Sequence, residues 1–149
     1  MKAFIQRAKS GKVRINGQVF GEIQSGYVIL LGVGHDDNEK DAELLAEKTA
    51  NLRIFSNQEG KFDYSLLEVK GQALVVSQFT LMADLKKGRR PDFTKAAQPS
   101  LAEKLYLYFV QCLKNKGIEV KTGKFGSEME VEIINHGPVT IMLDTENSE

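Results

Sequence analysis

The chain has 149 residues, 42% of them hydrophobic and 27% charged, which is typical of a globular domain and excludes disordered and fibrous classes. Twenty basic residues balance twenty acidic ones, so net charge does not indicate a polyanionic partner, and any contact with nucleic acid must come from a local patch. A single cysteine, an apolar run no longer than 27–33 and a charged N-terminal segment exclude a disulfide framework, a membrane span and a signal peptide, so we expect a cytoplasmic protein.

The first third of the chain is typical of β-structure. The apolar segments 13–15 and 19–20 flank Asn16-Gly17, a dipeptide that accepts the positive φ angles of a tight hairpin turn. The continuous apolar run 27–33 has the length of a strand that is buried on both faces. We therefore expect a hairpin followed by a core strand.

Two helices are expected, one on either side of another buried strand over 73–81. The first begins in the segment 35–38, where Asp or Asn can cap it, and its inner face is formed by Ala42, Leu45, Thr49 and Leu52. The second begins at Ser100, whose spacing to Glu103 predicts a capping box, and ends at Gly117. Its apolar stripe consists of Leu101, Leu105, Phe109, Cys112 and Leu113.

The C-terminal segments 131–133 and 139–143 again alternate apolar and polar residues, with Asn135-His136-Gly137-Pro138 between them. Because strands group at both ends of the chain and the two helices are separated, the pattern favours a mostly antiparallel α+β fold over a doubly wound sheet. No repeat or linker divides the chain, so we expect a single domain over residues 1–149.

The usual catalytic and metal-binding groups lack partners in the sequence. His35, Cys112 and His136 have no metal-ligand spacing, so no metal or cofactor is expected. Cys112 lies on an apolar helix stripe without a basic neighbour, which favours a core role over that of a nucleophile. Nothing in the sequence pairs His136 with Ser77 or Thr80, so no nucleophile–base pair is visible.

Two motifs are unusual, and each has two interpretations. Ser77–Thr80 (Ser-Gln-Phe-Thr) places polar residues at the end of an apolar strand, either as a strand leaving the core or as backbone N–H groups turned toward a ligand. Gly137-Pro138 interrupts pairing between two strands, either as a turn with a trans bond or as a rigid wedge of backbone carbonyls.

A basic loop follows the first motif. Between residues 83 and 95 five cations stand against two acids, together with glycine and proline. The segment is either a solvated loop or a loop that grips phosphate beside a site. The cations are Lys86, Lys87, Arg89, Arg90 and Lys95.

These motifs resemble one family, the D-aminoacyl-tRNA deacylases, long called D-tyrosyl-tRNA deacylases, and the resemblance runs along essentially the whole chain. Its most specific part is the pair Ser77–Leu81 (Ser-Gln-Phe-Thr-Leu) and Gly137–Thr140 (Gly-Pro-Val-Thr), in this order. The expected fold class is therefore α+β, with mostly antiparallel, barrel-like β-sheets and two main helices. Matching segments also include 4–7, 30–37, 51–55, 75–76, 87–91, 122–126 and 135–136.

The resemblance implies an ester hydrolase that releases D-amino acids and glycine from the 3′ acceptor end of tRNA, without a cofactor. It also implies a homodimer with active sites at the subunit interface. The N–H groups of Phe79 and Thr80 are the implied oxyanion donors. The family's catalytic positions correspond to Ser77, Gln78, Phe79 and Thr80, and its positions for substrate binding and chiral selection to Gly137, Pro138, Arg7, Phe125 and Met129.

In this family the Gly-Pro bond is cis and enters the partner subunit's site, where its carbonyls reject the L-form, and the position of Arg7 orients it. The positions of Phe125 and Met129 line a pocket for the terminal adenosine. Lys124, Asp92 and Asp63-Tyr64 depart from the family's common residues, but none lies in the two motifs. The expected contacts to tRNA phosphates come from Lys86, Lys87, Arg89 and Arg90.

The chemistry fits the missing nucleophile–base pair. An aminoacyl ester is already activated, so hydrolysis needs an oriented carbonyl, a stabilised oxyanion and a water, and losing one backbone donor typically costs about 10²–10³ in rate. The resemblance implies that the terminal 2′-hydroxyl of the tRNA helps to activate that water. Two alternatives stay open: a small-ester hydrolase with Thr80 as nucleophile, and a non-enzymatic RNA-binding module.

Overall fold

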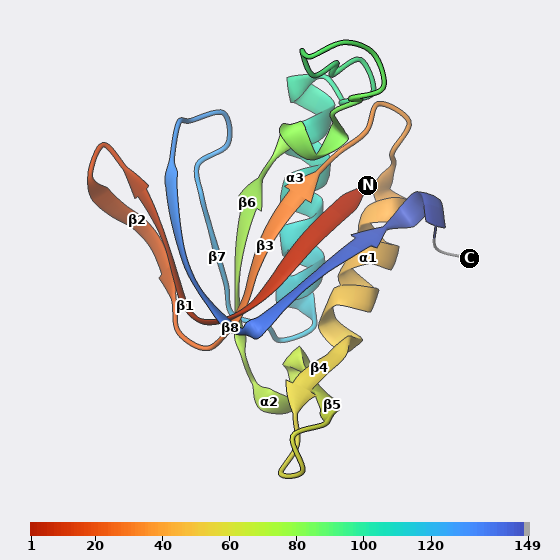
Figure 1. The fold of residues 1–149 in the computed structure, drawn as a ribbon. Helices are drawn as coiled ribbons and strands as arrows, with labels where there is room; N and C mark the ends of the chain where they lie inside the picture. The colour runs from red at the N-terminus through yellow and green to blue at the C-terminus, as the bar shows by residue number, and fades with distance from the viewer. Residues whose placement is uncertain (148–149) are drawn as a thin grey trace.

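The computed structural model describes residues 1–147, with strands and helices in the order shown in Figure 1. A short 3₁₀ turn, η1 (Phe79–Met82), follows the sixth strand, and a second, η2 (Thr145–Asn147), follows the last. The other elements are β1 (Lys2–Ile15), β2 (Gln18–Ile23), β3 (Gly26–Gly32), α1 (Glu39–Asn51), β4 (Arg53–Ser56), β5 (Phe62–Ser65), α2 (Leu66–Val69), β6 (Gln72–Ser77), α3 (Pro99–Asn115), β7 (Val120–Thr122) and β8 (Glu130–Asp144).

The strands form one large curled sheet and one small hairpin. The large sheet has the order β2-β1-β3-β6-β7, and β8 pairs antiparallel with β1 along nearly its whole length. The β3–β6 and β6–β7 pairings are parallel, whereas β4 and β5 form a separate antiparallel hairpin. The sheet curls into a nearly closed barrel, with α1 and α3 side by side along one of its sides (Figure 1). The expected mostly antiparallel, barrel-like α+β class is confirmed.

Two apolar clusters hold these layers together. The larger one lies between the sheet and the two main helices and includes Tyr27, Leu45 and Phe109, each fully buried. The smaller one is built by inward-facing residues of β1, β2, β3 and β6: Ala8, Val13, Ile23, Val28, Leu74 and Val76. Because β3 and β6 contribute to both clusters, they are buried on both faces, which explains their continuous apolar sequences.

Several local predictions are confirmed. Asn16 and Gly17 adopt φ angles of 51° and 78° in the β1–β2 turn. The run expected over 27–33 forms β3, shifted by one residue. Asn38 caps α1 and completes a capping box with Asp41. The Asn38 side chain accepts from the Lys40 N–H, and the Asp41 side chain accepts from the Asn38 N–H.

Three local predictions are wrong in detail. The strand expected over 73–81 ends at Ser77, because the chain turns at Gln78 into η1. The capping box of Ser100 with Glu103 does not form: α3 begins at Pro99, whose missing N–H and fixed φ suit the first helical position without a side-chain cap. The C-terminal segments form one long strand, β8, with an irregular pairing register, in place of two strands.

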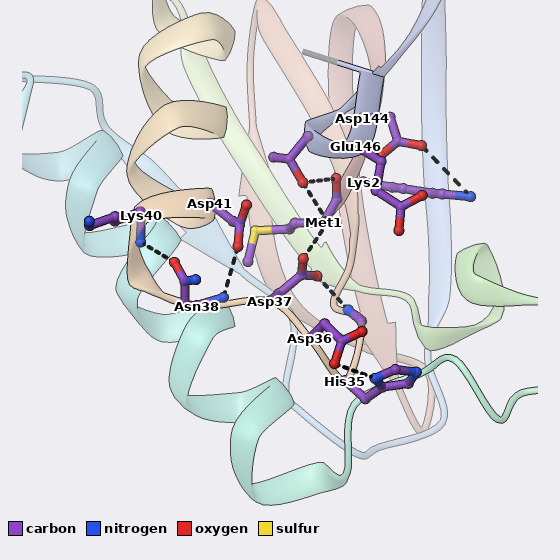
Figure 2. Close-up of polar contacts among 12 residues, drawn as sticks. Met1, Lys2, His35, Asp36, Asp37, Asn38, Lys40, Asp41, Asp144 and Glu146 are labelled. Carbon is purple, nitrogen blue, oxygen red and sulfur yellow. Dashed lines mark hydrogen bonds and ion pairs between the residues drawn. The ribbon is translucent and has the colours of Figure 1, made fainter. Parts of the chain in front are cut away.

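The start of β1 is anchored by its terminal ammonium group. Met1 is buried, and its ammonium lies 2.8 Å from Asp37 Oδ1 and 2.8 Å from Thr145 Oγ1 (Figure 2). Asp37 Oδ2 also accepts a 2.6 Å hydrogen bond from the Gly34 N–H. These contacts tie the chain start to the segment before α1 and to the turn after β8. Among residues 1–147, no helix combines the length and apolar character needed to cross a bilayer.

Candidate active site

The polar end of β6 leaves the sheet through a tight turn. Ser77 forms the last parallel pair with Leu31, whose carbonyl also accepts a 2.8 Å hydrogen bond from the Gln78 N–H. The chain then enters η1, in which the Leu81 N–H donates to the Gln78 carbonyl at 3.2 Å. A Cβ at Gly32 would lie 3.0 Å from the Leu81 Cβ, so this glycine lets the turn pack closely against the end of β3. We call residues 77–80 the strand end.

The strand end presents two unpaired backbone donors. Within residues 1–147, the backbone N–H groups of Phe79 and Thr80 donate no hydrogen bond. The cause is their position, because the first N–H groups of a helical segment have no intrahelical partner. Both residues are exposed, whereas the Thr80 hydroxyl already accepts a hydrogen bond from Gln78 Nε2. Two adjacent N–H groups are therefore available to an oxygen atom of a ligand.

A pocket of about 650 Å³ opens beside the strand end. Its walls come from β6, the segment before α3, the first turn of α3 and the segment 125–131. The rings of Phe79 and Phe93 meet edge to face at its rim, with centroids 5.0 Å apart. Predicted site residues that line this pocket are Ser77, Gln78, Phe79, Phe125 and Met129.

The far wall of the pocket is apolar and tightly packed. The ring centroids of Phe125 and Tyr106 lie 6.0 Å apart. The Tyr106 hydroxyl donates a 2.8 Å hydrogen bond to the Val75 carbonyl. Burial raises the pKa of Tyr106 to about 12, so this hydroxyl stays neutral. Met129 covers Gly123, where an added Cβ would lie 2.6 Å from the Met129 sulfur. The wall is thus fixed to β6, the strand that leads into the turn with the two donors.

The second motif forms a bulge in β8. The pairing with β1 passes from Gln6–Thr140 directly to Ala8–Asn135, so residues 136–139 all lie opposite Arg7. We call these residues the bulge. Its base is closed by Asn135 Oδ1, which accepts a 3.1 Å hydrogen bond from the Val139 N–H. Within the bulge the Gly137–Pro138 bond is cis, as the resemblance implies, and both residues are exposed.

The buried side chain of Arg7 supports the bulge through a hydrogen bond. It is only 6% exposed, and its Nε donates a 3.0 Å hydrogen bond to the His136 carbonyl. Its Nη1 donates to the Ile54 carbonyl at 2.8 Å and to Ser56 Oγ at 3.3 Å. The His136 side chain is exposed, and local desolvation, with smaller effects of Arg7 and Lys9, lowers its pKa, which keeps the imidazole neutral at pH 7.

The structure therefore gathers the predicted residues into two groups. Ser77, Gln78 and Phe79 meet Phe125 and Met129 in one pocket, whereas Thr80 lies next to it in the chain and does not line it. Arg7 meets the bulge that holds the Gly137–Pro138 step. The residues that line the pocket include none from the bulge of the same chain, in the part that the structure describes.

The basic loop is exposed and held at its base. Asp84 and Asp92 exchange backbone hydrogen bonds of 2.7 and 3.0 Å, and Lys95 lies 3.7 Å from the Asp84 carboxylate. Hydrogen bonds from Thr94 lower the pKa of Asp92. The side chains that extend beyond this base are Lys86, Lys87, Arg89 and Arg90.

Two other candidate residues, His35 and Cys112, do not line the pocket. His35 is half exposed and lies 3.0 Å from Asp36, as expected for a solvated loop histidine. Cys112 packs partly against the main core, where burial chiefly raises its pKa. No cluster of His, Cys, Asp or Glu within residues 1–147 could hold a metal ion.

Sequence reasoning missed Phe93 and the segment 96–99 as pocket walls, and it missed the β4–β5 hairpin that contacts Arg7. No local signal marks the pocket-wall residues, because they reach the site through long-range pairing: Gly34 bridges Ala96, and the Ala97 N–H donates to the Val33 carbonyl at 3.0 Å. The role of Arg7 came from the resemblance alone.

Comparison with known proteins agrees along the whole chain. A family model described as D-Tyr-tRNA(Tyr) deacylase matches residues 4–144. A D-aminoacyl-tRNA deacylase of Thermosipho africanus is 50% identical over 145 residues, covering 97% of each chain. One of Bacillus cytotoxicus is 47% identical over 145 residues, covering 97% of this chain and 99% of its own.

Solved structures agree as well. The c-Myc DNA Unwinding Element Binding Protein superposes with a TM-score of 0.91 at 38% identity, over 97% of this chain and 99% of its own. The structure of a probable eukaryotic D-amino acid tRNA deacylase superposes with a TM-score of 0.82 over 95% of this chain and 97% of its own. At 17% identity, the second likeness concerns the fold alone.

Proposed function

The chain belongs to the D-Tyr-tRNA(Tyr) deacylase family, and we infer that it is a D-aminoacyl-tRNA deacylase, a hydrolase of the ester bond between a D-amino acid and tRNA. The observation that carries the mechanism is the pair of unpaired N–H groups at Phe79 and Thr80, which lie beside a pocket without a nucleophile–base pair. Its substrates are D-aminoacyl-tRNA and mischarged glycyl-tRNA, met in the cytoplasm.

In this mechanism the strand end stabilises the oxyanion. The scissile carbonyl oxygen lies against the N–H groups of Phe79 and Thr80, which become its hydrogen-bond donors as the tetrahedral intermediate forms. Backbone donors held by the sheet need no reorganisation during the reaction, which is why such a site can supply most of the rate enhancement. Ser77 and Gln78 place these donors: Ser77 ends the ladder with β3, and Gln78 directs the chain into η1.

The attacking water is activated by the substrate. The 2′-hydroxyl of the terminal ribose lies next to the ester and helps to activate the water, because the strand end carries no histidine, lysine or carboxylate that could act as a general base. The Thr80 hydroxyl is engaged by Gln78, and no histidine, lysine or carboxylate contacts it among the described residues, which argues against a nucleophilic threonine. A terminal 2′-deoxyadenosine in the tRNA tests this step, because it should slow hydrolysis strongly while leaving binding nearly unchanged.

The apolar wall of the pocket binds the terminal adenosine. A base can stack on the Phe125 ring, and Met129 offers a polarizable surface beside it. The tight packing of Phe125 on Tyr106 supports this role, because a preformed wall binds without ordering itself first. The basic loop then contacts the phosphates of the acceptor stem through Lys86, Lys87, Arg89 and Arg90.

Chiral selection comes from a second copy of the chain. The Gly137–Pro138 step, which we call the wedge, enters the pocket of the partner subunit and directs two carbonyl oxygens at the place of an L side chain. The exposure of the wedge supports this arrangement, and so do two exposed apolar side chains of the same strand, Ile134 and Met142. A D-amino acid turns its side chain away from these carbonyls, and glycine has none to exclude.

Two experiments test the proposed function against its alternatives. Purified protein should hydrolyse D-tyrosyl-tRNA far faster than D-tyrosine methyl ester, whereas a small-ester hydrolase would cleave both. An RNA-binding module would retain D-tyrosyl-tRNA on a filter without shortening the lifetime of its ester. Retention without hydrolysis, at enzyme concentrations that saturate the tRNA, would exclude the deacylase.

A further inference from the structure

The support of Arg7 comes mainly from outside the large sheet. The bulge offers its guanidinium one acceptor, the His136 carbonyl at 3.0 Å. The β4–β5 hairpin offers three contacts: the Ile54 carbonyl at 2.8 Å, Ser56 Oγ at 3.3 Å, and the ring of Phe62, whose centroid lies 5.8 Å from Cζ. The hairpin therefore determines where the guanidinium lies, and the guanidinium in turn holds the bulge.

The hairpin is itself fixed to the core. Phe55 stacks on Tyr27 with centroids 5.2 Å apart and an interplanar angle of 17°. Arg53 pairs with Asp63 across the two strands, and this contact lowers the pKa of the Asp63 carboxyl, which keeps it ionised. Asn57 Oδ1 closes the connecting turn by accepting from the Glu59 and Lys61 N–H groups at 2.9 and 3.1 Å. Such a hairpin is a firm base for a neighbouring side chain.

The contact of Phe62 with Arg7 is not part of the apolar core. Phe62 is 55% exposed and lies outside both apolar clusters. A ring over a guanidinium attracts it through the ring quadrupole and limits its tilt. The guanidinium packs closely against the wedge, because a Cβ at Gly137 would lie 2.9 Å from Arg7 Nη2. A small tilt of the guanidinium would therefore shift the Gly137 backbone directly.

We propose that the β4–β5 hairpin is a specificity-determining support, in which Ser56 and Phe62 are positioning residues that lock Arg7 and thereby aim the carbonyls of the wedge. The inference rests on the proposed function, since it assigns a cause to the precision of L-rejection. Loosening the support lets the wedge tilt, so the selectivity between D- and L-substrates falls while the oxyanion donors, on another element, stay in place. The chemical step on glycyl-tRNA is then unaffected.

The test compares single-turnover deacylation of D-tyrosyl-, L-tyrosyl- and glycyl-tRNA by five variants, one of which is Arg7→Lys. Phe62→Ala should lower the D/L rate ratio about two- to fivefold, and Ser56→Ala about two- to tenfold, with the glycyl rate unchanged. Phe62→Tyr keeps the ring and should restore the wild-type ratio. Tyr64→Ala removes an exposed aromatic from the same strand that, within residues 1–147, makes no hydrogen bond or ring contact with Arg7, and should keep the ratio as well.

The outcomes separate this inference from the proposed function. A wild-type D/L ratio in both Phe62→Ala and Ser56→Ala, measured on folded protein, overturns the hairpin support. If Arg7→Lys lowers the ratio while those two variants do not, the wedge stands and its support lies elsewhere. Equal loss of D-tyrosyl and glycyl rates would show a general structural role and would also overturn the inference. A wild-type protein without D-preference would overturn both proposals.

Discussion

The strand end and the bulge are built in opposite ways. The strand end is continuous with a buried parallel strand, lines a pocket of its own chain and offers backbone N–H groups. The bulge is an exposed irregularity of β8, held by a hydrogen bond from the buried Arg7. The difference suggests a division of labour. In the proposed mechanism, backbone donors just beyond the end of β6 supply the rate, and carbonyls aimed by Arg7 supply the selectivity.

The largest effect is expected from removing one donor at the strand end. Phe79→Pro deletes the Phe79 N–H at the first position of η1, where proline is tolerated, and Gln78 before it has a non-helical backbone. We expect about 10²–10³-fold slower hydrolysis of D-tyrosyl- and glycyl-tRNA alike. Phe79→Ala is the matched control, because it loses the ring but keeps the N–H. Equal rates for the two variants would remove Phe79 from the oxyanion site.

A smaller and selective effect is expected at the bulge. In Gly137→Ala the new Cβ would lie 2.8 Å from Val139 Cγ2 and 2.9 Å from Arg7 Nη2, at a φ of 127°. The wedge must move, so the D/L ratio should fall about tenfold or more while the glycyl rate changes little. Gly117→Ala adds a Cβ at a similarly unfavourable φ of 91° in open space, and should keep the ratio. A parallel loss of all three rates in Gly137→Ala would contradict the division of labour.

Thr80→Ala should have a slight effect. The substitution removes the hydroxyl that Gln78 Nε2 contacts but keeps the backbone N–H. If the donors and the tRNA hydroxyl perform the reaction, the rate on D-tyrosyl-tRNA should fall less than about tenfold, the effect of one lost neutral hydrogen bond. Single-turnover rates measure this directly. A variant that is inactive although it folds like the wild type would favour the nucleophilic threonine.

No effect is expected at Cys112, which belongs to neither region. Its thiol is half-buried on α3, and burial raises its pKa, so little thiolate is present at neutral pH. Treatment with iodoacetamide should be slow and should leave deacylation unchanged. Rapid modification with loss of activity would place a reactive thiol at the site.

Local signals in the sequence predicted what local geometry decides. Asn16-Gly17 determines its own turn, and Asn38 caps its own helix through adjacent backbone. The apolar pattern predicts a strand that continues to Leu81, because Phe79 and Leu81 extend the pattern, whereas the strand ends at Ser77. These residues serve the pocket and the turn against Gly32, contacts that no pattern along the chain records.

The bulge shows the same limit more sharply. Gly137-Pro138 indicates an interruption of pairing, and the interruption is found, but Arg7 lies opposite it only because β1 and β8 pair from the two ends of the chain. The supporting contacts of Ile54, Ser56 and Phe62 come from a third segment. Register between distant strands depends on the whole sheet, so these contacts emerge only once the chain is folded.

The most direct test measures the rates at which the wild-type protein hydrolyses D-tyrosyl-, L-tyrosyl- and glycyl-tRNA under single-turnover conditions. We expect the D-ester and the glycyl ester to be cleaved at similar rates. The L-ester should be cleaved more slowly by a factor of about a hundred or more. Equal cleavage of the D- and L-esters would contradict selection by the wedge. Stable D- and glycyl esters would contradict the deacylase itself.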